Sequence, residues 1–181
     1  MLTITVLANE LYNEENNTFV TVAKDQVLLL EHSLISLSKW ESHYCKPFLT
    51  KENKTVEETM QYIKCMTLNG TVDKNVYDLI TQKELTLVMD YIYAPMTATT
   101  FSNNKQKITN SEIITAELIY YWMVALTIPF ECEKWHLNRL LTLINVCNLK
   151  NQPKKELTRE ETYARNRELN EQRRRLMGTK G

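Results

Sequence analysis

Residues 130–141, FECEKWHLNRLL, gather the side chains from which metal sites and active sites are built. Cys132 and His136 stand four residues apart, so on one helix they would face the same ion. A second pair of the same types, His43 and Cys45, is separated by one residue. Two such pairs supply enough ligands for a zinc ion, but their spacing matches no zinc motif. We therefore interpret the cysteines as core residues and the histidines as partly exposed polar residues, and we predict no metal ion.

Nucleophilic or acid–base catalysis has no better support in the sequence. No strained nucleophile turn of the G-x-S-x-G type occurs. The paired carboxylates Glu57/Glu58 and Glu160/Glu161 stand at predicted helix starts, where the helix dipole already favours negative charge. The chain has only three glycines, too few and too scattered for a loop that cradles phosphate. We expect no catalytic residues, no cofactor and no enzymatic activity.

The composition indicates a folded body of ordinary size. The chain has 181 residues, of which 43% are hydrophobic and 24% charged, so enough apolar side chain is present for a core. No apolar run approaches the roughly 18 residues of a membrane span, so we expect no membrane partner. The four cysteines include no C-x-x-C pair, and the sequence opens without the basic and apolar parts of a signal peptide. These features predict reduced thiols in a cytoplasmic protein.

Charge divides the chain into two parts, although the formal net charge is zero. Residues 1–149 hold 12 basic against 17 acidic residues, and residues 150–181 hold 10 against 5. An acidic body followed by a basic tail is typical of proteins that use the tail for an interaction. We place the body at 1–149, a linker at 150–155 and a basic C-terminal helix or tail at 156–181.

The elements that would position these residues begin with β structure. Short runs of β-branched residues predict an antiparallel element at 2–31, either a hairpin or a three-stranded meander. Helical periodicity then predicts a helix at 33–44. Thr55 and Glu58 form a capping box for a second helix, which the pair Asn69-Gly70 would end.

The second half of the body is expected to be helical as well. Residues 72–94 contain one or two helices, and the polar, turn-rich residues 95–111 form a loop. The most apolar helix opens at Ser111-Glu112 and is hydrophobic almost all round, which predicts a central buried helix. Pro129 begins a further helix that continues to Asn148. The predicted class is therefore mainly α with a small N-terminal antiparallel β element (α+β) and a detached, charged C-terminal helix.

Two tryptophans of the body carry separate predictions. Trp40 and Trp135 are assigned to the core first and to a partner groove second. Trp135 and Arg139 stand four residues apart on the helix predicted after Pro129, so they are placed to form a cation–π pair.

The basic tail carries the residues most suited to contact a partner. They are Arg165, Arg167, Arg173, Arg174 and Arg175. An arginine run attracts nucleic acid, because neutralised phosphates release counterions. Glutamates interleave with the arginines along the tail, however, in pairs that stabilise an isolated helix. A solvated helix that docks on another protein is therefore favoured over nucleic-acid binding.

Three stretches together carry a resemblance to a known family. They are LEHSLISLSKWESHYCKPFL (30–49), ITAELIYYWMVALTIPFECEKWHLNRLLTLINVCNLKNQPKK (114–155) and RNRELNEQRRRLMGTKG (165–181). They resemble the tail assembly chaperones of tailed bacteriophages. The resemblance implies a non-enzymatic protein of the host cytoplasm. It would cover apolar helices of the phage tape measure protein and, through a distinct C-terminal extension, contact the tail tube protein.

Two alternatives stay open beside that expectation. The chain could be a structural virion component, such as a head–tail connector or a tail accessory protein. It could also be an accessory protein that binds nucleic acid through the basic tail. Self-association is compatible with each of these functions.

Overall fold

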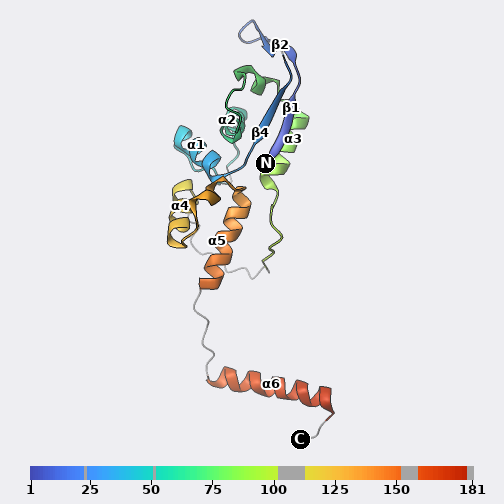
Figure 1. The fold of residues 1–181 in the computed structure, drawn as a ribbon, viewed down its shortest axis with the longest axis vertical. Helices are drawn as coiled ribbons and strands as arrows, with labels where there is room; N and C mark the ends of the chain where they lie inside the picture. Colours follow the sequence, from blue (N-terminus) through green and yellow to red (C-terminus); the bar gives the residue numbers. More distant parts are fainter. Residues whose placement is uncertain (23, 51, 102–112, 152–158, 179–181) are drawn as a thin grey trace. The chain divides into compact units, whose positions relative to one another are not determined.

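The computed structural model of the protein describes residues 1–22, 24–50, 52–101, 113–151 and 159–178 (Figure 1). The chain forms two units, Met1–Asn148 and Leu149–Gly181. The expected class is confirmed, because the fold is mainly helical with a small antiparallel β element near the N-terminus. No described helix is both long and apolar enough to cross a membrane. The elements are, in order, β1 (Leu2–Val6), β2 (Asn9–Asn13), β3 (Thr18–Val22), β4 (Gln26–Leu30), α1 (Leu34–Tyr44), α2 (Val56–Met66), η1 (Lys74–Leu79), α3 (Gln82–Tyr93), α4 (Ala116–Ala125), η2 (Phe130–Lys134), α5 (Leu137–Asn151) and α6 (Arg159–Met177).

The β element is a nested hairpin and not a meander. The outer strands β1 and β4 pair with each other, and the inner strands β2 and β3 pair with each other, both antiparallel. Two residues separate β1 from β2, whereas three separate β3 from β4, so the register shifts by one between the two pairs. A shift of one residue in register moves every side chain of a strand to the opposite face of the sheet. The two strand pairs therefore need not have their buried side chains on the same face.

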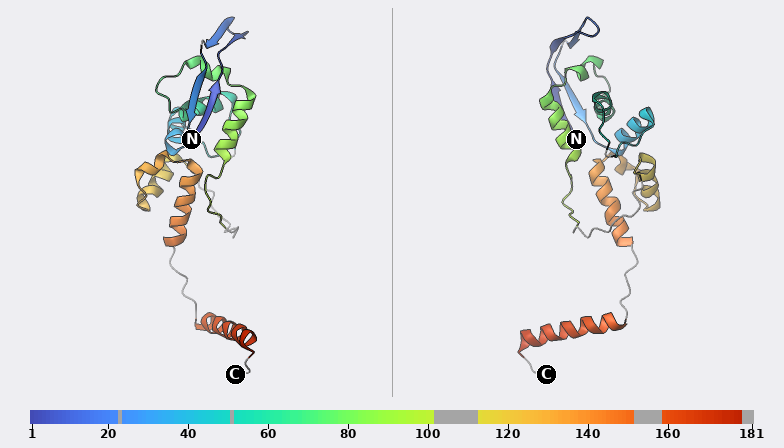
Figure 2. Two further views of the ribbon diagram at one scale, coloured as in Figure 1. Left: turned by 45° about the vertical axis from the view of Figure 1, so that its right-hand side comes forward. Right: turned by 180° about the vertical axis from the view of Figure 1, so that it is seen from behind.

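The outer strand pair has one face buried in the core. Ile4, Val6, Leu28 and Leu30 alternate along β1 and β4 and all lie in the core. The β1–β4 ribbon lies between α2 and α3 (Figures 1 and 2). Backbone hydrogen bonds tie β4 to the end of α2, and Glu31 N–H donates to Met66 O at 2.9 Å. Helices therefore cover the buried face of the outer strand pair.

The first three α-helices begin with the side-chain caps that their sequences encode. Ser33, Thr55 and Thr81 each accept from a backbone N–H three residues later, and the third residue bonds back to the cap. The predicted capping box of Thr55 and Glu58 is confirmed. The predicted end of α2 is wrong, because the helix ends at Met66 and not at Asn69-Gly70. The chain leaves the helix there to pair with β4, and Leu68 N–H donates to Leu29 O at 2.8 Å.

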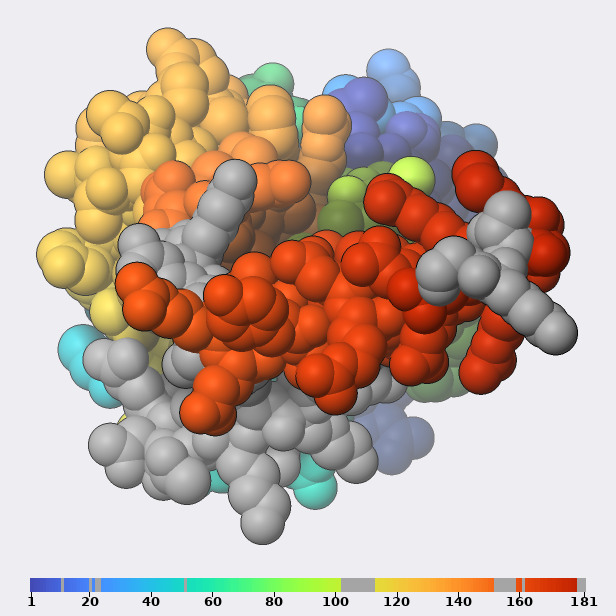
Figure 3. Space-filling view, turned by 90° about the horizontal axis from the view of Figure 1, so that it is seen from below, coloured from blue at the N-terminus to red at the C-terminus, as the bar shows by residue number. Residues whose placement is uncertain are grey.

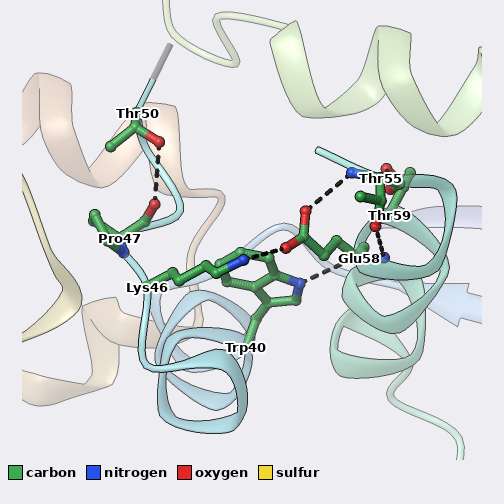
Figure 4. Close-up of polar contacts among 7 residues, drawn as sticks. All are labelled: Trp40, Lys46, Pro47, Thr50, Thr55, Glu58 and Thr59. Carbon is green, nitrogen blue, oxygen red and sulfur yellow. Dashed lines mark hydrogen bonds and ion pairs between the residues drawn. The ribbon is translucent and has the colours of Figure 1, made fainter. Parts of the chain in front are cut away.

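Trp40 joins α1 to the start of α2 (Figure 4). Its indole N–H donates to Glu58 O at 2.9 Å, and Lys46 Nζ lies 3.0 Å from Glu58 Oε1. The Thr55 backbone N–H donates to the other carboxylate oxygen. This hydrogen bond and the contact with Lys46 lower the pKa of the Glu58 carboxyl group. The assignment of Trp40 to the core is confirmed, since its side chain is almost fully buried.

We expect Trp40→Phe to lower the free energy of unfolding by about 1–3 kcal/mol. The substitution removes the indole hydrogen bond and part of a fully buried ring. Urea denaturation measures the loss. Trp135→Phe is the matched control, because Trp135 is half-buried, and its cost should be clearly smaller. Equal losses in the two variants would contradict the role given to Trp40.

The most apolar helix differs from its prediction in position and in burial. The predicted opening at Ser111-Glu112 lies outside the described residues, and α4 begins at Ala116 behind the capping residue Thr115. Only one side of α4 is buried, through Ala116, Ile119 and Met123. The helix therefore lies at the surface of the body and not in its centre.

The second unit consists of α6 and its flanking residues. α5 extends through Asn151, so the first two residues of the predicted linker, Lys150 and Asn151, are helical. Residues 152–158 lie outside the described part of the chain. The described side chains of α6 are all exposed, and Figure 3 shows one face of this helix in orange to red.

Candidate functional site

The stretch FECEKWHLNRLL does not form the single helix predicted after Pro129. Residues 130–134 form the short 3-10 helix η2, Trp135 is extended, and α5 begins at Leu137. The break arises because this backbone pairs with the start of α1: Leu137 N–H donates to His32 O at 2.7 Å. Cys132 and His136 consequently do not share one helical face, which removes the geometric basis of the metal hypothesis.

His136 and His32 lie together in the core. Their exposed fractions are 5% and 2%, and their ring centroids are 5.0 Å apart. The interpretation of the histidines as partly exposed is therefore wrong for these two residues, whereas His43 is exposed. The sequence held no signal for this pairing, because the two residues are more than a hundred positions apart.

Each buried histidine has defined hydrogen-bond partners. His136 Nδ1 accepts from Asn138 N–H at 3.3 Å, and its Nε2 lies 3.0 Å from Tyr91 O. These two contacts place the single proton of the neutral ring on Nε2. His32 Nδ1 bonds to the phenolic oxygen of Tyr62. The cluster thus joins β4, α2, α3 and the start of α5.

Burial keeps this cluster uncharged. Desolvation, together with a smaller effect of the neighbouring His136, lowers the pKa of His32 to about 3. Desolvation also lowers the pKa of His136, against the opposing effect of its bond to Tyr91. The phenol of Tyr62 has a raised pKa for the same reason. Two buried neutral imidazoles cannot accept a proton from a substrate in solvent, so the cluster is suited to stability and not to acid–base catalysis.

Cys65 and Cys132 lack the surroundings of a reactive thiol. Burial raises the pKa of Cys132 and of Cys65, whereas a catalytic cysteine needs a lowered value. The predicted pair His43 and Cys45 is exposed at the end of α1. Within the described residues no group of three or more His, Cys, Asp or Glu side chains is placed to hold a metal ion.

Glu41 is a buried carboxylate with a structural role. Its Oε1 accepts from Phe48 N–H and its Oε2 from Ala116 N–H, each at 2.7 Å. One side chain on α1 therefore holds both the loop after that helix and the first residue of α4. Both oxygens accept from backbone donors and the side chain is buried, so the carboxylate holds two backbone segments in place.

The exposed side of α4 is the apolar surface that the sequence did not predict. Tyr121 is 65% exposed and Val124 62% exposed, and both point away from the buried side. Glu117 and Ala125 complete this side, which we call the outer face of α4. The only sequence signal was a helix apolar all round, which fits burial in a core equally well.

Aromatic and acidic residues border the outer face of α4. Phe130 is exposed, and its ring centroid lies 6.4 Å from that of Tyr120. The phenol of Tyr120 donates to Glu133 at 2.9 Å, and burial together with this bond raises its pKa to about 12. Later in FECEKWHLNRLL, the guanidinium carbon of Arg139 lies 4.2 Å from the ring centroid of Trp135, which confirms the predicted cation–π pair.

The five arginines predicted to bind a partner all lie on α6 and all are exposed. At about 100° per residue, Arg167, Arg173 and Arg174 fall within one third of the helix circumference. Arg165 falls on the other side of the helix, and Arg175 falls about 80° from Arg167 with Glu171 between them. The structure therefore brings three of the five predicted residues together and separates the other two from them.

No family model, curated protein sequence or solved structure matches this chain. The function is therefore argued from the surfaces of the two units.

Proposed function

We propose that this protein is a non-enzymatic assembly protein of a tailed bacteriophage that binds apolar helical segments of the tape measure protein. The observation that carries the proposal is the outer face of α4. Tyr121 and Val124 stand largely in solvent on a helix whose opposite side is packed in the core. Contiguous exposed apolar side chains of this kind mark protein-interaction sites.

The chemistry of this face suits a helical partner. A tyrosine and a valine one turn apart offer a ridge against which an apolar helix stripe can pack. Tyrosine supplies a large, stiff contact area, so Tyr121 is the expected centre of the interaction. Glu117 lies on the same face and Glu133 beside it, which favours basic residues flanking the apolar stripe of the partner.

The identification of the partner rests on the resemblance to tail assembly chaperones. A tape measure protein offers long apolar helices that need covering before the tail tube forms around them. The contact with the tail tube protein that the resemblance implies stays a prediction. The proposed contact with the tape measure protein needs no cofactor.

Co-expression with the tape measure protein of the same phage tests the proposal. We expect the full-length chain to keep the long protein soluble and to co-purify with it. Tyr121→Gln/Val124→Gln should reduce the affinity at least about tenfold, because truncating central apolar contacts typically costs 1 kcal/mol or more each.

The matched control changes the same residue types at other exposed positions. Tyr93 is 74% exposed and Val56 79% exposed, and neither lies on α4. Tyr93→Gln/Val56→Gln should leave binding unchanged. A tape measure protein that stays insoluble with the unmodified chain, or equal losses in both double variants, would overturn the proposal.

A further inference from the structure

Charge on α6 is divided between two sides of the helix. Interleaved along the sequence, four of the six arginines separate from the glutamates once the residues are placed at about 100° per residue around the axis. An arc of about 120° then contains four arginines, two asparagines and a tyrosine, and no carboxylate. We call this arc the basic face; its residues are Arg159, Tyr163, Asn166, Arg167, Asn170, Arg173 and Arg174.

The acidic side chains occupy a different part of the circumference. Glu168 lies on the opposite side of α6, and Glu160 and Glu171 border the basic face on one edge. In the described part of α6 no arginine forms an ion pair within 4.0 Å. No described side chain therefore competes with an external anion for the four guanidinium groups of the basic face.

The composition of the basic face favours nucleic acid over an acidic protein. A protein interface needs an apolar centre, and the arc of the basic face offers only Tyr163 and, at the last residue of the helix, Met177. The two leucines of the helix, Leu169 and Leu176, lie outside the face. Arginine, asparagine and tyrosine are side chains that contact phosphates and base edges.

From this arrangement we infer that α6 binds duplex DNA through its basic face. The major groove is about 12 Å wide and admits an α-helix. A helix of 19 residues is about 28 Å long, which spans most of one turn of the duplex. With the basic face toward the bases and phosphates, Glu168 points to solvent. The proposal does not depend on the contact assigned to α4.

Fluorescence anisotropy with a labelled 24-bp duplex DNA and the full-length chain tests the inference. Four phosphate contacts predict an affinity that falls on the order of 100-fold between 50 and 200 mM salt. Arg167→Gln/Arg174→Gln should weaken binding at 50 mM salt at least about tenfold. It should also reduce the salt-dependent loss to the order of tenfold, because two phosphate contacts remain.

The matched control is Arg165→Gln/Arg175→Gln. It removes the same charge from the same helix with the same residue types, but from positions outside the basic face. We expect its affinity to stay within about threefold of the unmodified chain, and circular dichroism to show equal helix content in both variants. Equal weakening by the two double variants would overturn the inference, since only overall charge would then matter.

Two competing probes exclude the alternatives. Polyglutamate of equal charge should not displace the DNA, and effective displacement would indicate an acidic protein partner instead. Duplex RNA should bind less tightly, because its major groove is too narrow for a helix. Tighter binding of RNA than of DNA would also overturn the inference.

Discussion

Glu41→Ala is expected to lower the free energy of unfolding by about 3–5 kcal/mol, the largest effect of any single substitution considered for this protein. The Glu41 carboxylate accepts from the backbone N–H groups of Phe48 and Ala116, both at 2.7 Å and both buried. Removing the acceptor leaves two buried donors unpaired, and each unpaired donor costs about 1–3 kcal/mol. Urea denaturation at pH 7 measures the change.

Glu41→Gln separates the loss of charge from the loss of hydrogen bonds. The amide keeps one acceptor oxygen but turns its NH₂ group toward the second backbone N–H, so an intermediate loss is expected. Glu117→Ala is the control, because Glu117 is an exposed carboxylate in the first turn of the same helix, α4. Its interaction with the helix dipole predicts a loss below about 1 kcal/mol. A loss at Glu41 no greater than that at Glu117 would contradict the bridging role.

Acidification from pH 7 to pH 5 is expected to cost about 2 kcal/mol of stability through His32 alone. The pKa of this histidine falls from 6.5 to about 3 on folding. The unfolded state therefore binds a proton first as the pH drops below about 6.5, and stability is lost progressively down to about pH 3. His136 acts in the same direction, because burial also lowers its pKa. Urea denaturation at pH 7 and at pH 5 measures this loss in the free energy of unfolding.

Substitution of the histidines identifies the source of the pH dependence. His32→Leu should lower stability at pH 7 and abolish at least half of the change between pH 7 and pH 5. His43→Gln should leave that change intact, because His43 is exposed. The carboxylate of Glu58, whose pKa is lowered on folding, contributes mainly below this pH range. An equal free energy of unfolding at pH 7 and pH 5 would contradict the lowered pKa of His32 in the folded protein.

Neither the buried histidine cluster nor the outer face of α4 could be predicted from local sequence patterns. His32 and His136 meet because the residues before α5 pair with those before α1, a long-range contact that no local pattern encodes. The exposure of Tyr121 depends likewise on which side of α4 the rest of the body covers. Periodicity predicts a helix there, but an all-round apolar helix carries no information about which side remains free.

Local patterns determined most of the secondary structure. The capping box at Thr55 acts within a few residues, so the sequence alone predicted the start of α2. The predicted boundary at residue 94 lies one residue from the end of α3 at Tyr93. The division into an acidic body and a basic helix is also a property of the sequence. The angular separation of arginines and glutamates on α6 follows from the sequence once the segment is known to be helical.

Tertiary structure decided everything that depends on contacts between distant segments. It set the nested pairing of β1 with β4, the early end of α2 at Met66, and the break at Trp135 that divides FECEKWHLNRLL into two elements. At the end of α2 and at the break before α5, backbone hydrogen bonds to a remote segment outweighed the local helical preference, because buried N–H and C=O groups must be satisfied. The reactive-looking residues of that stretch were thereby separated, and Cys132 and His136 became parts of the core.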